Sequence, residues 1–327
     1  MSEANSTSTV ARLFGFLLTM CIAGTVLAQD YPARPLRLIV PWPPGGGADV
    51  IARVIFQKVG DSIGQQVIVD NRGGASTIIG MDIVAKAAPD GYTLGFPTSN
   101  LTVNPALFSK LPFDVVRDLA AVTQAVNGLY ILAVHPALSV KSVGELIALA
   151  KTSPGKLNAS IADAGTPTHL GLEQFKAMAG VSIAAINYKG AAPAATGLLS
   201  GETQLMFVSA PTVLTQVQAG RLRAIAVMGG KRSSALPELP TIAESGLDGY
   251  AVSEWYGVVA PGGTNAAHID RMNAEIRKVL ALPEVRDRLV VLGAKVVAST
   301  SQQFGAFLKA DIAKWSKLVR DAGIKAE

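Results

Sequence analysis

The sequence predicts an α/β protein of two lobes, and three observations carry that prediction. Strand-like and helix-like segments alternate along most of the 327 residues, which is typical of α/β folds with parallel sheets. Hydrophobic residues make up 49% of the chain and charged residues 16%, enough for a sizeable core. An apolar segment over 120–136 separates two such series, and we expect the chain to cross between lobes there.

The first series begins with a strand-like run at 35–42, followed by a helix whose apolar positions fall on one face. The same apolar patterns predict the strands and helices that come later in the chain. In the first series we expect a strand at 65–71, a helix at 76–88 and a strand at 92–99. In the second we expect helices at 143–151, 168–180, 192–201 and 213–222, and strands at 156–165, 182–190, 203–211 and 223–230.

The end of the chain returns to the first lobe. A loop rich in Pro, Gly and Ser over 231–250 precedes a return strand at 252–261, and two amphipathic helices finish the chain. These helices have no strand series of their own, so we expect them to cover the first lobe. The predicted organisation is a first lobe of 29–127 plus 251–327, a second lobe of 128–250, two chain crossings and a ligand cleft between the lobes.

Residues 1–28 have the features of a cleaved signal peptide. Arg12 precedes an apolar run that ends in Val26-Leu27-Ala28, with small residues at the positions that favour cleavage. The alternative is a membrane anchor, but the run falls short of the about 20 apolar residues that span a bilayer. Met20 before Cys21 is too bulky for a lipoprotein signal. After cleavage no cysteine would remain, which suits a periplasmic location.

The composition argues against several classes of function. Lys and Arg are scattered and the net charge is only +5, so no nucleic-acid footprint is expected. His135, His169 and His268 have no acid or Cys at metal-ligand spacing, and no nucleophile elbow is present. We therefore expect no catalytic residues, no metal and no cofactor, and a binding role rather than turnover.

The stretch 41–49, PWPPGGGAD, lies between the first strand and the first helix. It matches neither the dinucleotide fingerprint nor the P-loop. Consecutive glycines let backbone N–H groups turn toward a ligand, and the helix N-terminus adds a partial positive charge. This arrangement suits a carboxylate as well as a phosphate. The alternative is a tight turn in which Asp49 only caps the helix.

A second loop repeats this arrangement in the other series. In 160–175, SIADAGTPTHLGLEQF, Gly165 precedes Thr166 at the N-cap position and Pro167 at the first helical position. Ligands of doubly wound sheets lie beyond the carboxyl ends of the strands. Two facing loops of this kind would direct two helix N-termini into one cleft, where a carboxylate is held without an arginine.

Several polar or aromatic residues at strand ends are further candidates. Tyr188 can donate a hydrogen bond to a carboxylate, although an aromatic at that position can equally pack a lobe edge. Lys189 could steer an anion or remain a solvated surface charge. Ser99, Asn100 and Ser209 follow strands, where turn residues are also common.

The chain resembles the solute-binding proteins of tripartite tricarboxylate transporters, the Bug family of extracytoplasmic receptors. The resemblance spans nearly all residues after 28. It rests on YPARPLRLIVPWPPGGGAD, VIVDNRGGA, DGYTLGF, NPALFSKLPFDVVRDL, GTPTHLGLEQFKAMAG, INYKGAAPAATGLLSGE, AGRLRAIAV, LPTIAESGL and EWYGVVAPGGT. It implies a monomeric, two-lobed periplasmic binding protein (type II, Venus flytrap) that closes on a small carboxylate and delivers it to membrane permease subunits.

The resemblance also implies which residues contact the ligand. Combined with the candidates above, the predicted set is Trp42, Pro44, Gly45, Gly46, Gly47, Asp49, Ser99, Asn100, Gly165, Thr166, Thr168, His169, Tyr188, Lys189 and Ser209. Departures from the family pattern, among them Trp42 for Phe and Asn187 for Pro, lie on or beside the ligand loops. They leave the ligand open among mono- and dicarboxylates, amino acids and aromatic acids.

Two other functions compete with carriage to a permease. The chain could instead report its ligand to a two-component sensor kinase. It could also be a secreted enzyme acting on a carboxylated substrate, with His169 and either Asp163 or Asp49 as acid–base partners.

Overall fold

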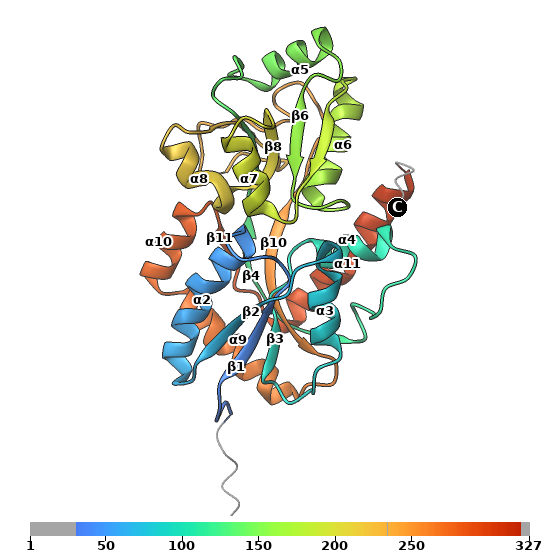
Figure 1. Ribbon diagram of the computed structural model, residues 1–327. Coiled ribbons are helices and arrows are strands. Elements are labelled where there is room, and N and C mark those ends of the chain that lie inside the picture. The colour runs from blue at the N-terminus through green and yellow to red at the C-terminus, as the bar shows by residue number, and fades with distance from the viewer. Residues whose placement is uncertain (1–30, 234, 322–327) are drawn as a thin grey trace, which may run out of the picture. The chain divides into compact units, whose positions relative to one another are not determined.

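The computed structural model describes residues 31–233 and 235–321, and the predicted signal peptide lies outside them. Both sheets belong to one compact unit that begins at Arg34. The first sheet has the order β11-β4-β10-β3-β1-β2 and the second the order β7-β6-β8-β5-β9 (Figure 1). We call each sheet, with the helices packed on it, a lobe.

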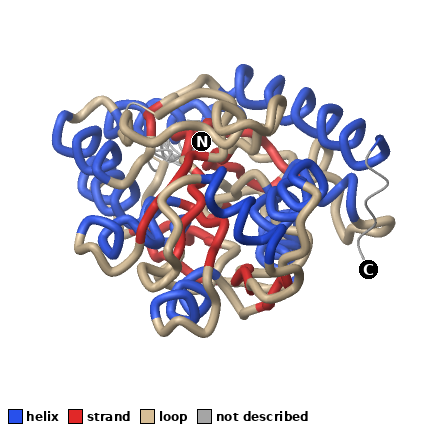
Figure 2. Tube along the Cα trace, turned by 90° about the horizontal axis from the view of Figure 1, so that it is seen from above, coloured by secondary structure: helices blue, strands red, loops and turns tan. Residues whose placement is uncertain are grey.

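The strands have the following bounds. The first sheet contains β1 (Leu36–Val40), β2 (Val67–Asn71), β3 (Thr93–Gly95), β4 (Leu119–Gly128), β10 (Glu254–Pro261) and β11 (Lys295–Val296). The second contains β5 (Tyr130–Val134), β6 (Asn158–Ile161), β7 (Ala184–Asn187), β8 (Leu205–Ser209) and β9 (Arg223–Val227). In Figure 2 the helices lie around these strands.

The helices are divided between the lobes in the same way. The first lobe has α2 (Gly47–Ile63), the short 3₁₀ helix η1 (Ala75–Thr77), α3 (Ile78–Ala85), α4 (Asn100–Leu107), α9 (Ala266–Leu280), α10 (Pro283–Val291) and α11 (Ser301–Asp321). The second has α5 (Val143–Thr152), α6 (Pro167–Ala179), α7 (Ala191–Leu199) and α8 (Ala210–Gln218). Each lobe therefore has the predicted alternating α/β composition.

The chain passes between the sheets twice, as predicted. Only Leu129 separates β4 in the first sheet from β5 in the second, and the chain returns to the first sheet at Glu254. The two crossings lie side by side, because Glu254 is paired with Gly128 and the N–H of Met228 donates to the carbonyl of Tyr130. We call this pair of crossings the hinge region.

The sheets are mixed rather than wholly parallel, which corrects one expectation. β1 pairs in parallel with β2 and β3, but β10 runs antiparallel to β3 and β4. In the second sheet β5 runs antiparallel to β8 and β9. Strands that cross between lobes enter the next sheet in the opposite direction, which a period-two pattern does not reveal.

The C-terminal part contains one helix and one short strand more than expected. Pro283 takes the first position of α10 after the N-cap Leu282, and this proline ends the amphipathic pattern of α9. The two-residue strand β11 then pairs with β4. As expected, α9 and α11 pack on the first lobe, against β4.

Each lobe has its own apolar core. In the second lobe Phe175 and Phe207 meet edge to face, with ring centroids 5.5 Å apart. In the first lobe Trp255 packs edge to face against Phe304 at 5.5 Å and Phe307 at 5.6 Å. These cores hold the strand ends, and the loops that follow them, in fixed positions beside the hinge.

Candidate binding site

A cavity of about 60 Å³ lies between the two sheets, beside the hinge. Both lobes and both crossings contribute to it. Its lining consists of Trp42, Pro43, Gly46, Gly47, Ala48, Thr98, Asn100, Tyr130, Ala162, Thr166, Pro167, Thr168, Ala191, Met206, Phe207, Val208, Ser209, Thr212, Glu254 and Tyr256. Of the predicted set, the cavity brings together Trp42, Gly46, Gly47, Asn100, Thr166, Thr168 and Ser209.

The loop between β1 and α2 supplies one wall of the cavity. Gly46 is the N-cap of α2, and the Gly47 N–H donates to the Thr212 hydroxyl on α8 of the other lobe at 3.1 Å. Gly45 has φ +82°, a conformation that favours glycine, but it lies exposed with Pro44 outside the cavity lining. The loop therefore presents the helix N-terminus through Gly46 and Gly47 alone.

Asp49 shapes this loop from behind and does not line the cavity. Its carboxylate accepts hydrogen bonds from the Gly45 N–H at 3.0 Å, from Arg53 Nε at 2.9 Å and from Asn71 Nδ2 at 3.1 Å. Burial acts to raise the pKa of Asp49, but these hydrogen bonds outweigh it, and the pKa is lowered. Asp49 therefore stays ionised and anchors the glycine run.

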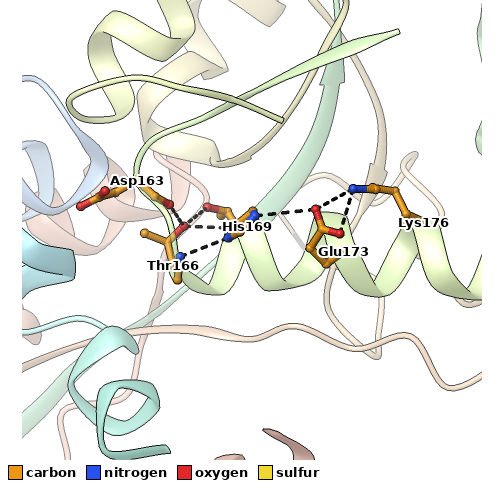
Figure 3. Close-up of polar contacts among 7 residues, drawn as sticks. Asp163, Thr166, His169, Glu173 and Lys176 are labelled. Atoms are coloured by element: carbon orange, nitrogen blue, oxygen red, sulfur yellow. Dashed lines mark hydrogen bonds and ion pairs between the residues drawn. The ribbon is translucent and has the colours of Figure 1, made fainter. Parts of the chain in front are cut away.

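The loop between β6 and α6 supplies the opposite wall. Thr166 caps α6, since its hydroxyl accepts the His169 N–H at 3.2 Å and donates to the Asp163 carbonyl at 2.9 Å (Figure 3). The Thr168 hydroxyl lies 3.1 Å from that of Thr166. The predicted N-cap and the proline at the first helical position are both observed.

His169 supports this second loop from outside the cavity. Its Nδ1 accepts the Gly165 N–H at 3.1 Å, while Nε2 lies 3.6 Å from Glu173, whose carboxylate Lys176 also contacts (Figure 3). Burial is the main cause of the lowered pKa of His169. A neutral ring whose Nδ1 accepts a backbone N–H is not poised as a general base toward the cavity, which argues against the acid–base pairing with Asp163 or Asp49.

The two helix N-termini are the source of positive potential in the cavity. Gly47 and Ala48 begin α2, and Pro167 and Thr168 begin α6. Each such terminus carries roughly half a positive charge on its first N–H groups, of which the Gly47 N–H is already bonded to Thr212, while Pro167 has none. No Lys, Arg or His is among the residues that line this cavity. The site can therefore hold one carboxylate by backbone dipoles and hydroxyls.

Trp42 and Asn100 complete the first-lobe side of the cavity. Trp42 Nε1 donates to the Thr98 hydroxyl at 3.3 Å, which fixes the indole at the wall. Asn100 Nδ2 donates to Ser76 Oγ at 3.0 Å. Ser99 lies behind this wall, where its hydroxyl meets that of Tyr130 at 3.1 Å.

Tyr188 and Lys189 are not brought to the cavity. The Tyr188 ring lies over Gly197 of α7, and burial together with nearby Glu202 raises the pKa of its hydroxyl. Lys189 is exposed. Ligand contact by these two residues stays a prediction, as it does for Pro44, Gly45, Asp49, Ser99, Gly165 and His169, which also lie outside the lining.

The floor of the cavity contains a polar cluster in which the predicted Ser209 meets two residues outside the predicted set, Glu254 and Tyr256. Glu254 and Tyr256 come from β10 and meet Ser209 at the end of β8. Burial raises the pKa of Glu254 from 4.5 to about 8. One signal was present in the sequence, a single acid within the otherwise apolar return strand VSEWYGVVAP, but only the fold places it beside a ligand cavity.

Contacts across the cleft show that the lobes touch around the cavity. Besides the bond from Gly47 to Thr212, the Ser76 N–H donates to Asp163 Oδ2 at 3.2 Å. Pro43 lies so close to Gly190 of the second lobe that a Cβ there would come within 2.9 Å of the proline ring. This is the arrangement expected of a closed binding protein.

Two further classes of site are not found in the described part of the chain. Residues 31–233 and 235–321 contain no group of three or more His, Cys, Asp or Glu side chains that could hold a metal. Within those same residues, no helix has the length and apolar character needed to cross a bilayer.

Replacing Thr166 by valine tests the cap of the second loop. Valine keeps the shape but removes the hydroxyl, so the His169 N–H and the Asp163 carbonyl lose their partner. We expect the unfolding free energy to fall by about 1 kcal/mol, measured by urea denaturation. Thr152→Val, at the exposed end of α5, is the control and should change it by less than about 0.5 kcal/mol. An equal loss in both variants would contradict the capping role.

The chain matches a known protein family over most of its length. The family described as "Tripartite tricarboxylate transporter family receptor" matches residues 51–324. Protein BugT from Bordetella pertussis is 38% identical over 323 residues, which cover 98% of this chain and 99% of that protein.

Solved structures of related proteins have the same fold as this chain. Rpa4515 from R. palustris, solved with adipate, is 33% identical and has a TM-score of 0.87, covering 91% of this chain and all of the other. MatC from Rhodopseudomonas palustris, solved with bound malate, is 26% identical and has a TM-score of 0.83, covering 88% of this chain and all of the other.

Proposed function

Because the chain belongs to the tripartite tricarboxylate transporter receptor family, whose members are binding proteins and not enzymes, we propose that it captures a small carboxylate in the cavity between its lobes and delivers it to a membrane permease. The periplasm is the proposed location, after cleavage near Ala28. Related proteins of known structure are periplasmic.

One observation carries this proposal: two helix N-termini meet in a cavity whose lining contains no basic side chain. A carboxylate between the two helix starts would accept hydrogen bonds from the Ala48 N–H of the first lobe and from the Thr168 N–H and hydroxyl of the second lobe at once. A ligand held by both lobes favours the closed form, because it loses half of its partners when they separate.

The remainder of the cavity supports a ligand with an apolar body. Trp42, Met206, Phe207 and Tyr256 contribute aromatic or aliphatic surface beside the helix termini. With no cation in the lining, a tricarboxylate would be under-neutralised, so we infer one or two carboxylates. Relatives solved with adipate and malate have ligands of this size and charge.

A thermal-shift comparison of acids with their amides tests the proposal. In protein stripped of bound ligand, adipate, malate and other small carboxylates are screened beside the matched diamides. A ligand at 100 times its Kd adds about 2.7 kcal/mol to stability, a rise of several degrees in Tm. We expect a rise with at least one acid and none with its amide, since an amide carries no charge and offers N–H donors to a site made of donors. A screen of such acids without any shift would contradict the proposal.

A further inference from the structure

Three oxygen atoms at the floor of the cavity form a closed triangle. Tyr256 Oη lies 2.5 Å from Glu254 Oε1, Ser209 Oγ lies 2.9 Å from Glu254 Oε2, and Ser209 Oγ lies 2.8 Å from Tyr256 Oη. All three separations are hydrogen-bond distances. We call these residues the Glu254 ring.

The ring requires three protons, one for each of its contacts. The Tyr256 and Ser209 hydroxyls supply two. If Glu254 were ionised, one of the three contacts would join two oxygens with no proton between them, which is repulsive. If Glu254 is protonated, it donates to Ser209, Ser209 donates to Tyr256 and Tyr256 donates back to Glu254, so that each group donates once and accepts once.

The surroundings of Glu254 also disfavour its charged form. Its side chain is buried, with a relative exposure of 5%, and no described cation forms an ion pair with it. Burial raises its pKa to about 8, against the opposing effect of the Leu129 N–H and the two hydroxyls. One titratable neighbour is Tyr130, whose hydroxyl is bonded to Ser99. Glu254 also lines a second groove beside the hinge region, and the charged residues of that groove are Lys231, Arg232, Lys295, Asp311 and Lys314.

The position of the ring gives it a mechanical role. Glu254 and Tyr256 belong to β10 of the first lobe, and Ser209 ends β8 of the second, so the ring joins the lobes. Glu254 is also paired with Gly128 beside the one-residue crossing at Leu129. Close to a hinge, a small displacement is magnified at the far ends of the lobes. A ring that joins the lobes here is therefore placed to influence the angle between them.

We propose that Glu254 is a positioning residue that carries a proton in the folded protein and, through its ring with Ser209 and Tyr256, holds the hinge at the angle where the two helix N-termini face each other. This inference rests on the proposed capture of a ligand by closing. Loss of the proton removes one hydrogen bond of the ring and turns that contact repulsive, so closing weakens as the pH rises.

The first test needs no ligand and follows thermal unfolding of wild type and Glu254→Gln between pH 5 and 9.5. Glu254 has a raised pKa in the fold, so folding takes up a proton between about pH 4.5 and about pH 8. As the pH rises through that window, the Tm of wild type should therefore fall relative to the Tm of Glu254→Gln. Above the window, the difference between the two Tm values should stay constant. Glutamine donates and accepts in the ring but does not titrate. Parallel curves for the two proteins would overturn the proton assignment.

The second test measures the angle between the lobes. Cys21 is replaced by serine, and spin labels are attached at Lys86→Cys after α3 and Lys151→Cys on α5, both exposed. In wild type we expect two label-to-label distances, one for each angle between the lobes. The ratio of the second population to the first should grow about tenfold per pH unit as Glu254 ionises. Glu254→Gln should show one population throughout, and Ser209→Ala should show both at every pH.

The second test decides whether the Glu254 ring controls the angle between the lobes. A wild-type distance distribution that does not change with pH, or one that changes equally in Glu254→Gln, overturns the role of the ring. Because no ligand is present in either test, a negative carboxylate screen would contradict the proposed function and leave these results standing.

Discussion

Gly47→Ala is expected to weaken ligand binding by about 10- to 100-fold while both lobes stay folded. A Cβ at this position would lie 2.6 Å from Ser209 Oγ and 3.0 Å from Tyr256 Oη. These atoms belong to the Glu254 ring, so they cannot turn away as a free side chain would. Overpacking of this kind costs about 1–3 kcal/mol. Ser209 belongs to the second lobe, so the contact with it is relieved when the lobes stay apart, and that part of the cost falls on closing.

Gly46→Ala is the matched control for this prediction. The neighbouring glycine has φ −79°, and a Cβ there would meet nothing closer than the Pro43 carbonyl oxygen at 3.8 Å. Gly46 also lines the cavity, but its Cβ would not press on the second lobe, so calorimetry with the acid identified by the thermal-shift screen should show a smaller loss for Gly46→Ala than for Gly47→Ala. Both variants should keep the wild-type Tm without ligand to within a few degrees. Equal binding by the two variants would show that Gly47 is not pressed against the second lobe.

Asp49→Ala is expected to lower the unfolding free energy by about 2–3 kcal/mol and to reduce ligand affinity. The side chain is 7% exposed, and its removal leaves the Gly45 N–H without its acceptor and the Asn71 amide with only the Trp42 carbonyl beneath the glycine run. The partner Arg53 is 53% exposed, so most of the loss comes from these hydrogen bonds rather than from the ion pair.

The pH dependence of stability separates this effect from a general loss of packing. The pKa of Asp49 is lowered in the fold, so its contribution is present above its ordinary pKa near 4 and is lost as the pH falls through the lowered value. Urea denaturation from pH 7 down to pH 3 should therefore show a shallower loss for Asp49→Ala than for wild type. Asp90→Ala, which breaks an exposed pair with Arg34 and removes the acceptor of the Tyr92 N–H, should cost less than Asp49→Ala, about 1 kcal/mol. A similar cost in the two variants would contradict the anchoring role.

The fold could be predicted from local patterns because each lobe is built of short units in sequence order. The strand–glycine–helix starts at 41–49 and 160–175 were recognisable, since N-caps, prolines and glycines act within a few residues. The antiparallel direction of β10 and the split of the C-terminal helices were not, because they depend on strand pairing and on one proline at 283.

The contrast between local signals and tertiary pairing also explains which residues of the cavity can be predicted from the sequence. Gly46, Gly47, Thr166 and Thr168 stand at helix starts, where a dipole argument needs no tertiary information. Tyr130, Thr212, Glu254 and Tyr256 come from the crossings and from a helix of the other series, and their positions follow only from the closing of two lobes on each other. Conversely, Asp49 and His169 were correctly placed on the loops, but they stabilise those loops from behind.

The order of strands in the first sheet also bears on how the protein is made. β10 lies between β4 and β3, yet it is synthesised after all five strands of the second lobe. Until residues 254–261 are available, β3 and β4 have no common neighbour and the first sheet is divided. A nascent chain can therefore complete its second lobe while its first lobe is still unfinished, although the first lobe begins earlier in the sequence. The insertion of β10 is the step that brings Glu254 to the hinge and completes the floor of the cavity.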